Sequence, residues 1–185
     1  MLKPIGTVAT PVESDNATRH TLLLVLNGLL FQIGWFSAVL GGNNIALAVT
    51  LALLVIHHLV FINSHKQWLL IAAITLLGLA VDTTLSLAGV LIFSQVQFGI
   101  PLWLLCIWVL FACTLNHSLA WLKNKPLLAV FVGAAAGPWS YFAGSKLSDV
   151  AFGEPLLQSL TIIIIVWAAL LPSLMLLSTK LANRH

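Results

Sequence analysis

The chain has few charged side chains. Of its 185 residues, 8 are lysine or arginine and 5 are aspartate or glutamate, so charged residues make up 7% of the sequence. Hydrophobic residues make up 60%, and the mean hydropathy is +1.05. Soluble globular domains carry roughly 25% charged residues. The composition therefore excludes an ordinary soluble domain and is typical of an integral membrane protein.

Cysteine is also rare, and the two present are Cys106 and Cys113. On one predicted helix they lie about 10 Å apart along the axis, which is too far for a mutual disulfide. The sequence has neither the histidine-rich repeats of membrane di-iron desaturases nor the set of paired histidines expected for two haems. We therefore expect no metal and no cofactor. A metal or haem held by His57 and His117 is the less favoured alternative.

Long apolar runs occupy nearly all of the chain. At about 20 residues for each membrane crossing, they predict an all-α protein, a polytopic membrane bundle of six transmembrane helices. The breaks between the runs are rich in glycine, asparagine, lysine and proline, which are turn and helix-start signals. The predicted spans are residues 21–40, 45–63, 68–93, 101–122, 127–145 and 156–178.

The distribution of positive charge predicts the orientation. With a cytoplasmic N-terminus, seven of the eight basic residues lie on the cytoplasmic side and only Lys146 lies outside. We expect both termini in the cytoplasm, with residues 1–20 as a flexible tail, 21–180 as the transmembrane domain and 181–185 as a second tail. A cleaved signal peptide is less favoured, because it would leave an odd number of spans. The net charge of +3 reflects topology, so no nucleic-acid partner is expected.

Several polar side chains lie inside the apolar runs. An ionisable group in hydrocarbon is costly, so such residues usually face a protein interior, a cavity or a ligand. They are therefore the candidates for function. The candidate catalytic residues are Asp82, His57 and His117, and the candidate binding residues are Asn27, Gln32, His58, Asn116, Trp139 and Tyr141.

The histidines belong to a polar layer on the cytoplasmic side, when depth is counted at about 1.5 Å per residue. His57, His58 and His117 lie in this layer. We expect His57 and His117 to face one another, with Asn27 and Asn116 completing a polar pocket. Hydrogen-bonded histidines are favoured over ligated ones, because the spacing of the two residues is not specific for a metal.

Asp82 lies in an outer layer together with Tyr141, while Gln32 falls near the middle. Small and polar residues recur around Asp82 at spacings of three and four, which places them on one helix face pointing into the bundle. These residues are Thr75, Gly78, Ser86 and Gly89. A depth difference of roughly 10 Å between Asp82 and the histidine layer argues against a tight acid-base dyad. Acid-base chemistry on a lipid-like substrate and proton-coupled transport both stay open.

Four segments carry a resemblance to known proteins: residues 27–36, 81–82, 116–122 and 137–141. The chain resembles a family of small, functionally uncharacterised multi-pass inner-membrane proteins of Gram-negative bacteria, over essentially the whole membrane region. The resemblance transfers no catalytic residue. It implies an association with genes for enzymes that modify unsaturated fatty acyl chains, such as cyclopropane-fatty-acid-synthase-like methyltransferases. That association implies a lipid-linked pathway.

These features predict a bacterial inner (cytoplasmic) membrane protein that binds a lipid or another apolar small molecule. Its expected role is that of an accessory protein or an enzyme of membrane-lipid or fatty-acyl modification. One alternative is a small-molecule transporter or a substrate-binding transport subunit, since some such subunits have six helices in about 20 kDa, the mass of this chain. The other is a structural partner protein. The expected partners are a membrane lipid or apolar small molecule, and a membrane protein or enzyme.

Overall fold

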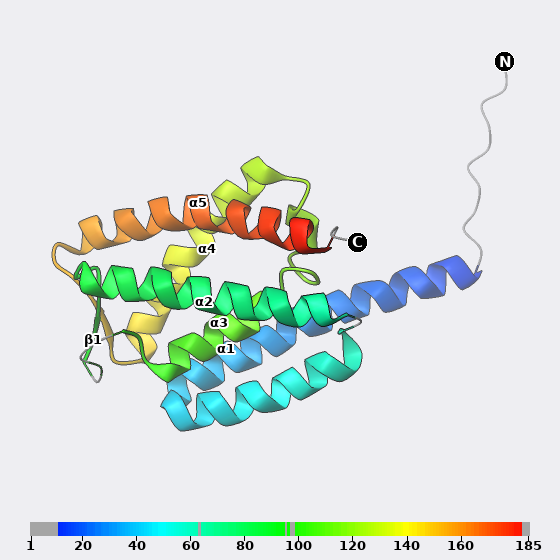
Figure 1. Cartoon of the computed structure of the whole chain (residues 1–185), viewed down its shortest axis with the longest axis horizontal. Coiled ribbons are helices and arrows are strands. Elements are labelled where there is room, and N and C mark those ends of the chain that lie inside the picture. Colours follow the sequence, from blue (N-terminus) through cyan, green and yellow to red (C-terminus); the bar gives the residue numbers. More distant parts are fainter. Residues whose placement is uncertain (1–10, 63, 95, 97–98, 183–185) are drawn as a thin grey trace, which may run out of the picture.

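The computed structural model of the chain describes residues 11–62, 64–94, 96 and 99–182. This part is helical except for one small pair of strands (Figure 1). Its elements are α1 (Pro11–Val60), α2 (His65–Leu87), β1 (Leu91–Phe93), α3 (Leu102–Ala112), the 3₁₀ helix η1 (Ala120–Leu122), α4 (Pro126–Leu147), β2 (Val150–Phe152) and α5 (Leu156–Ala182).

Within the described residues, four helices are long and apolar enough to cross a membrane. They are Asp15–Val60 within α1, His65–Leu87, Pro126–Leu147 and Leu156–Leu181. The prediction of an all-α membrane protein is therefore confirmed. The prediction of six separate helices is not, because the described residues form five α-helices and α3 is only 11 residues long.

α1 combines two of the predicted spans. Gly42, inside the predicted break, has φ 65° and ψ −166°, a backbone conformation that glycine adopts readily and other residues rarely do. The chain reverses direction there, so α1 is a hairpin with a first arm (residues 11–41) and a second arm (residues 43–60) (Figure 1). The arms pack closely, since a Cβ at Gly34 would lie 2.9 Å from Leu53 Cδ1.

The expected tails lie only partly within the described residues. Residues 11–20, expected in the flexible N-terminal tail, are the first turns of α1. Pro11 begins the helix, where proline is well tolerated because the first N–H groups have no helical partner. Residues 1–10 and 183–185 lie outside the described residues.

α2 ends earlier than the predicted span 68–93. The helix stops at Leu87, and Gly89 follows with φ 71°. β1 then pairs antiparallel with β2, with Leu91 opposite Phe152. Gly153 completes the contact, because its N–H donates to Val90 O at 3.1 Å and a Cβ there would overlap the carbonyl oxygen of Gly89. The small sheet thus connects the end of α2 to the start of α5.

α3 is also shorter than its predicted span, 101–122. Near its start, the backbone N–H of Trp103 donates a hydrogen bond to Asn43 Oδ1, a residue of the turn within α1, at 3.0 Å. The helix ends at Ala112, and residues 113–119 continue as consecutive turns in which Thr114 O accepts from His117 N at 3.0 Å.

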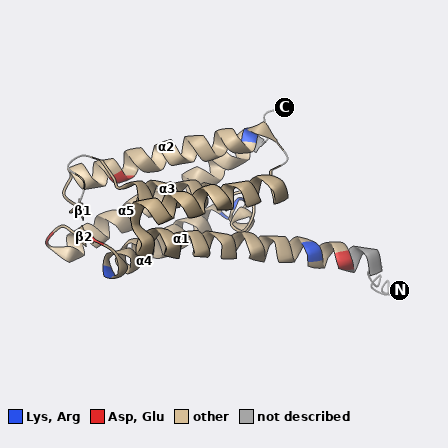
Figure 2. Ribbon diagram, turned by 90° about the horizontal axis from the view of Figure 1, so that it is seen from below, with Lys and Arg blue, Asp and Glu red and all other residues tan. Residues whose placement is uncertain are grey.

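The helices pack in two main pairs, α1 with α3 and α4 with α5, while α2 lies against α3. Close approach of α4 and α5 depends on two glycines, since a Cβ at Gly133 would overlap Trp167 O and one at Gly137 would overlap the Trp167 ring. Both described ends of the chain lie at one end of the molecule and the strands lie at the other (Figures 1 and 2).

Candidate functional site

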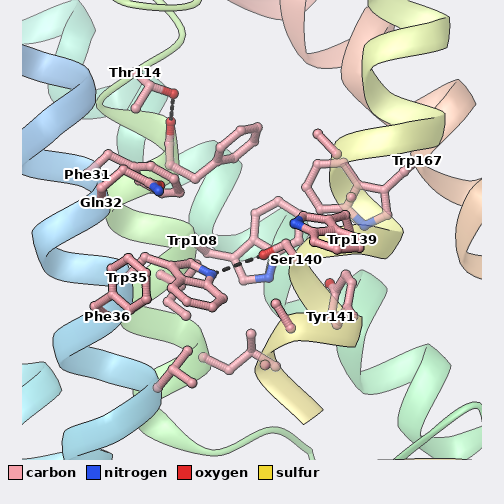
Figure 3. Close-up of a pocket in the computed structure, with 18 of the residues that line it drawn as sticks. Phe31, Gln32, Trp35, Phe36, Trp108, Thr114, Trp139, Ser140, Tyr141 and Trp167 are labelled. Carbon is pink, nitrogen blue, oxygen red and sulfur yellow. Dashed lines mark hydrogen bonds between the residues drawn. The ribbon is translucent and has the colours of Figure 1, made fainter. Parts of the chain in front are cut away.

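A cavity of about 750 Å³ lies between the first arm of α1 and α4. α3 and the turns after it form its floor, and α5 contributes Trp167 and Leu171. Aromatic side chains dominate its lining (Figure 3). They are Phe31, Trp35, Phe36, Trp103, Trp108, Phe111, Trp139, Tyr141 and Trp167.

α1 packs mainly on α3 and α4 mainly on α5, so α1 and α4 touch little and leave room for the cavity between them. Small residues on the facing surfaces add space, among them Gly28 on α1 and Gly137 and Gly144 on α4. A direct hydrogen bond crosses the gap, since Trp35 Nε1 donates to Ser140 Oγ at 3.0 Å (Figure 3). The cavity is therefore bridged from α1 to α4 rather than fully open.

Asp82 lies directly behind the aromatic lining and is completely buried, with 0% exposure. Its two carboxylate oxygens accept hydrogen bonds from Trp108 Nε1 at 2.7 Å and from the Tyr141 hydroxyl at 2.5 Å. Gly78, one turn earlier on α2, lets the Trp108 ring lie against that helix, because a Cβ there would overlap the ring. Asp82 thus joins α2 to α3 and α4 and fixes two side chains of the cavity.

These two side chains belong to an aromatic cluster around Trp167. The Trp108 and Trp167 rings are stacked, with centroids 5.5 Å apart and planes at 13°. The Tyr141 ring meets Trp167 at 62° with centroids 6.3 Å apart. Offset and tilted arrangements of this kind are the favoured geometries of aromatic pairs. The α5 side of the cavity is consequently a connected set of rings held at one end by Asp82.

The expected pair His57 and His117 comes together in the structure. Their ring centroids are 5.3 Å apart at 79°, and Phe61 lies against both rings at 5.1 and 5.0 Å. Neither histidine lines the large cavity. His58 is exposed and lies beside Trp68 instead, at 5.9 Å.

Asn27 has a definite bonding role that the sequence did not indicate. Its Nδ2 donates to Cys113 O at 3.2 Å, and its Oδ1 accepts from Ser118 N at 3.2 Å and Ser118 Oγ at 2.8 Å. It therefore satisfies backbone groups that the end of α3 leaves unpaired. Asn116 accepts from Lys123 Nζ at 2.7 Å. Asn27 and His57 line one small pocket together, which His117 and Asn116 do not line.

The other candidates can be placed against the large cavity. Gln32, Trp139 and Tyr141 line it, whereas Asp82 reaches it only through Trp108 and Tyr141. Within the described residues, no three side chains of His, Cys, Asp or Glu converge where a metal ion could be held.

The sequence analysis missed most of the α1 side of the cavity. Its lining residues recur at spacings of three and four, which marks one face of a helix. These residues are Gly28, Phe31, Gln32, Trp35, Phe36 and Val39. The spacing was available in the sequence, but an aromatic stripe on a membrane helix is equally compatible with contact to lipid.

Comparison with known proteins matches most of the chain to a family model. The family model described as "Protein of unknown function (DUF2878)" matches residues 24–173, which include the whole cavity lining. No curated protein and no solved structure matches the chain.

Proposed function

We propose that this chain, which belongs to the DUF2878 family, binds a lipid or another apolar small molecule in the cavity between α1 and α4. The observation that carries the proposal is the cavity itself. Its volume of about 750 Å³ falls within the roughly 300–1,000 Å³ of small-molecule sites, which are mostly apolar with a few polar groups. The lining here has that composition.

The role we propose is that of an accessory protein, or an enzyme, of membrane-lipid or fatty-acyl modification. The bonding of Asp82 favours a binding role over acid-base catalysis by this residue. Both of its oxygens already accept hydrogen bonds from the protein, and Trp108 and Tyr141 stand between it and the cavity. A general base must come within hydrogen-bonding reach of the proton that it removes.

The location we propose is the bacterial inner (cytoplasmic) membrane, with six crossings and both termini in the cytoplasm. The two arms of α1 account for two crossings, and α2, α4 and α5 for three. α3 alone rises about 16 Å, less than the roughly 30 Å of the hydrocarbon core, so the turns after it and η1 complete the sixth. Non-helical backbone at membrane depth is tolerated where protein satisfies it, as Asn27 does here.

The positive charges support this orientation. Lys and Arg gather at the end of the molecule where the chain begins and ends (Figure 2). Lys66 lies in the first turn of α2 and Lys180 in the last turn of α5, while Lys123 follows η1. Lys146 lies in the last turn of α4, at the strand end, and the acidic residues Asp149 and Glu154 flank strand β2.

Reporter fusions test the topology. Fusions after residues 42, 96 and 150 should be periplasmic, and fusions after residues 65, 124 and 185 should be cytoplasmic. Alkaline phosphatase and a fluorescent protein that matures only in the cytoplasm would be measured at each site. A periplasmic C-terminus would overturn the six-crossing proposal.

Filling the cavity tests the function. Ala136 lines the cavity, whereas its neighbour Ala135 does not, although both are exposed residues of α4. Native mass spectrometry of the protein purified in mild detergent should detect a bound apolar molecule in the wild type and in Ala135→Phe. Ala136→Phe should retain less than a tenth as much, because its ring occupies the site. Equal occupancy in both variants, or none in the wild type, would contradict the proposal.

A further inference from the structure

Among the described residues, no side chain of the cavity lining could neutralise a charged ligand. These described lining residues include no lysine, arginine, histidine, aspartate or glutamate. Moving an ion from water into an apolar site is strongly unfavourable unless the ion is paired. The nearest carboxylate, Asp82, uses both oxygens to accept bonds from Trp108 and Tyr141. The lining therefore favours an uncharged ligand.

Polar groups of the lining without a hydrogen-bond partner among the described residues include the buried Trp167 Nε1 and the amide of Gln32, an exposed residue. The Trp167 indole can only donate. Ser118 and Ser140 make hydrogen bonds within the protein, to Asn27 and Trp35 respectively, and Thr114 donates to Phe111 O at 2.6 Å. The Gln32 amide, in contrast, makes no hydrogen bond to any described residue. It can both donate and accept, so it suits a hydroxyl or a carbonyl group of a ligand.

The depth of Gln32 makes this missing partner significant. The residue precedes the Gly42 turn by ten positions on the first arm of α1, which is about 15 Å along the helix. That distance is about half of the hydrocarbon thickness, where water is not available to bond an amide. A ligand group beside Gln32 would remove this cost.

The cavity opens between α1 and α4, on the outer side of the helix bundle. Phe36 on α1 and Trp139 on α4 both line the cavity, yet they are 48% and 69% exposed. Figure 3 shows them on the two facing helices, near the Trp35–Ser140 bond that spans the gap. In a bundle whose outer surface is apolar, an opening between two membrane helices leads to the acyl chains of the bilayer.

We infer that the ligand is an uncharged long-chain molecule that enters the cavity from the bilayer and places its one hydroxyl or carbonyl group against the Gln32 amide. The inference rests on the proposed function and specifies the class of ligand for the same cavity. The apolar chain of the ligand lies among the aromatic rings, and Phe36 and Trp139 flank the opening through which it passes.

Brominated chains test the inference, because bromine quenches tryptophan fluorescence on contact and five tryptophans line the cavity. The full-length protein in phosphatidylcholine nanodiscs would be titrated with a brominated long-chain alcohol, the matching carboxylic acid at alkaline pH and the matching alkane. Quenching that persists in Ala136→Phe measures contact with the bilayer and is subtracted. The alcohol should quench saturably, and the ionised acid at least tenfold more weakly.

Variants of glutamine test the head-group contact. Gln32→Leu should weaken binding of the alcohol about three- to tenfold, which corresponds to the loss of one neutral hydrogen bond, and should leave binding of the alkane unchanged. Gln158→Leu, at an exposed position near the start of α5, is the matched control and should change neither.

The outcomes separate the two proposals. Equal affinity for the ionised acid and the alcohol would overturn the inference of an uncharged ligand while leaving the cavity as a binding site. Unchanged affinity of Gln32→Leu for the alcohol would overturn the head-group contact. If none of the three probes quenches saturably above the Ala136→Phe baseline, the proposed function itself fails.

Discussion

Asp82→Leu is expected to lower the free energy of unfolding by about 3 kcal/mol, because it leaves two buried donors without an acceptor. The donors are Trp108 Nε1 and the Tyr141 hydroxyl, and Asp82 itself is fully buried. Asp82→Asn keeps one acceptor oxygen, so its expected loss is smaller, about 1 kcal/mol. Unfolding in detergent, followed by intrinsic tryptophan fluorescence, measures both losses.

Asp149→Leu is the matched control for this prediction. Asp149 also accepts a side-chain hydrogen bond, from Ser94 Oγ at 3.2 Å, but it is exposed at the strand end. Its replacement should change stability by less than about 0.5 kcal/mol. If Asp82→Leu is as stable as Asp149→Leu, the two short hydrogen bonds do not hold the bundle together.

The same variants separate a positioning role from proton transfer. If Asp82 only orients Trp108 and Tyr141, Asp82→Asn should bind the apolar ligand with affinity close to that of the wild type. If Asp82 transfers protons, Asp82→Asn should still bind the ligand but should abolish any activity that depends on it. The structure favours the first result, since the carboxylate has no direct contact with the cavity.

Asp82 also illustrates what the sequence could predict. Its inward orientation followed from spacings of three and four on α2, and a charged residue within hydrocarbon has few other stable positions. The proximity of His57 and His117 followed from depth in the same way. Their actual neighbours did not follow, because Phe61 lies against both rings and Asn116 bonds Lys123. The depth of a residue along its helix does not determine which side chains from the loops contact that residue.

The ends of the helices were harder to predict for a different reason. Leu91–Phe93 is an apolar run, and hydropathy alone cannot distinguish a short strand from the last turn of a membrane helix. Its pairing with Val150–Phe152 joins segments far apart in the sequence. The end of α3 likewise depends on Asn27, which reaches Cys113 O and Ser118 N from another helix. No local pattern contains that information.

The turn within α1 could be predicted in part. A break was predicted at the run of Gly and Asn residues beginning at Gly41, and Gly42 has the one non-helical conformation found inside the helix. The reversal was therefore predictable. That the two arms would be joined with so little interruption was not, because glycine permits several turn conformations.

Gly133→Ala should destabilise the protein by about 2 kcal/mol, as expected when a methyl group is forced into a tightly packed contact. The added Cβ would overlap the carbonyl oxygen of Trp167 and would lie 3.0 Å from Leu171 Cβ. A backbone carbonyl cannot rotate away as a flexible side chain can, so α4 and α5 must separate. Their separation would also displace the Trp167 ring and weaken ligand binding.

Gly144→Ala is the matched control on the same helix. A Cβ at Gly144 meets no atom within 4 Å and points into free space beside the cavity. Exchanging glycine for alanine within a helix is otherwise stabilising by roughly 0.5–1 kcal/mol, so this variant should be at least as stable as the wild type. The two variants add the same methyl group and differ only in what it meets, which isolates the contact with the Trp167 backbone. Equal stability of the two would show that α4 and α5 do not depend on close packing at Gly133.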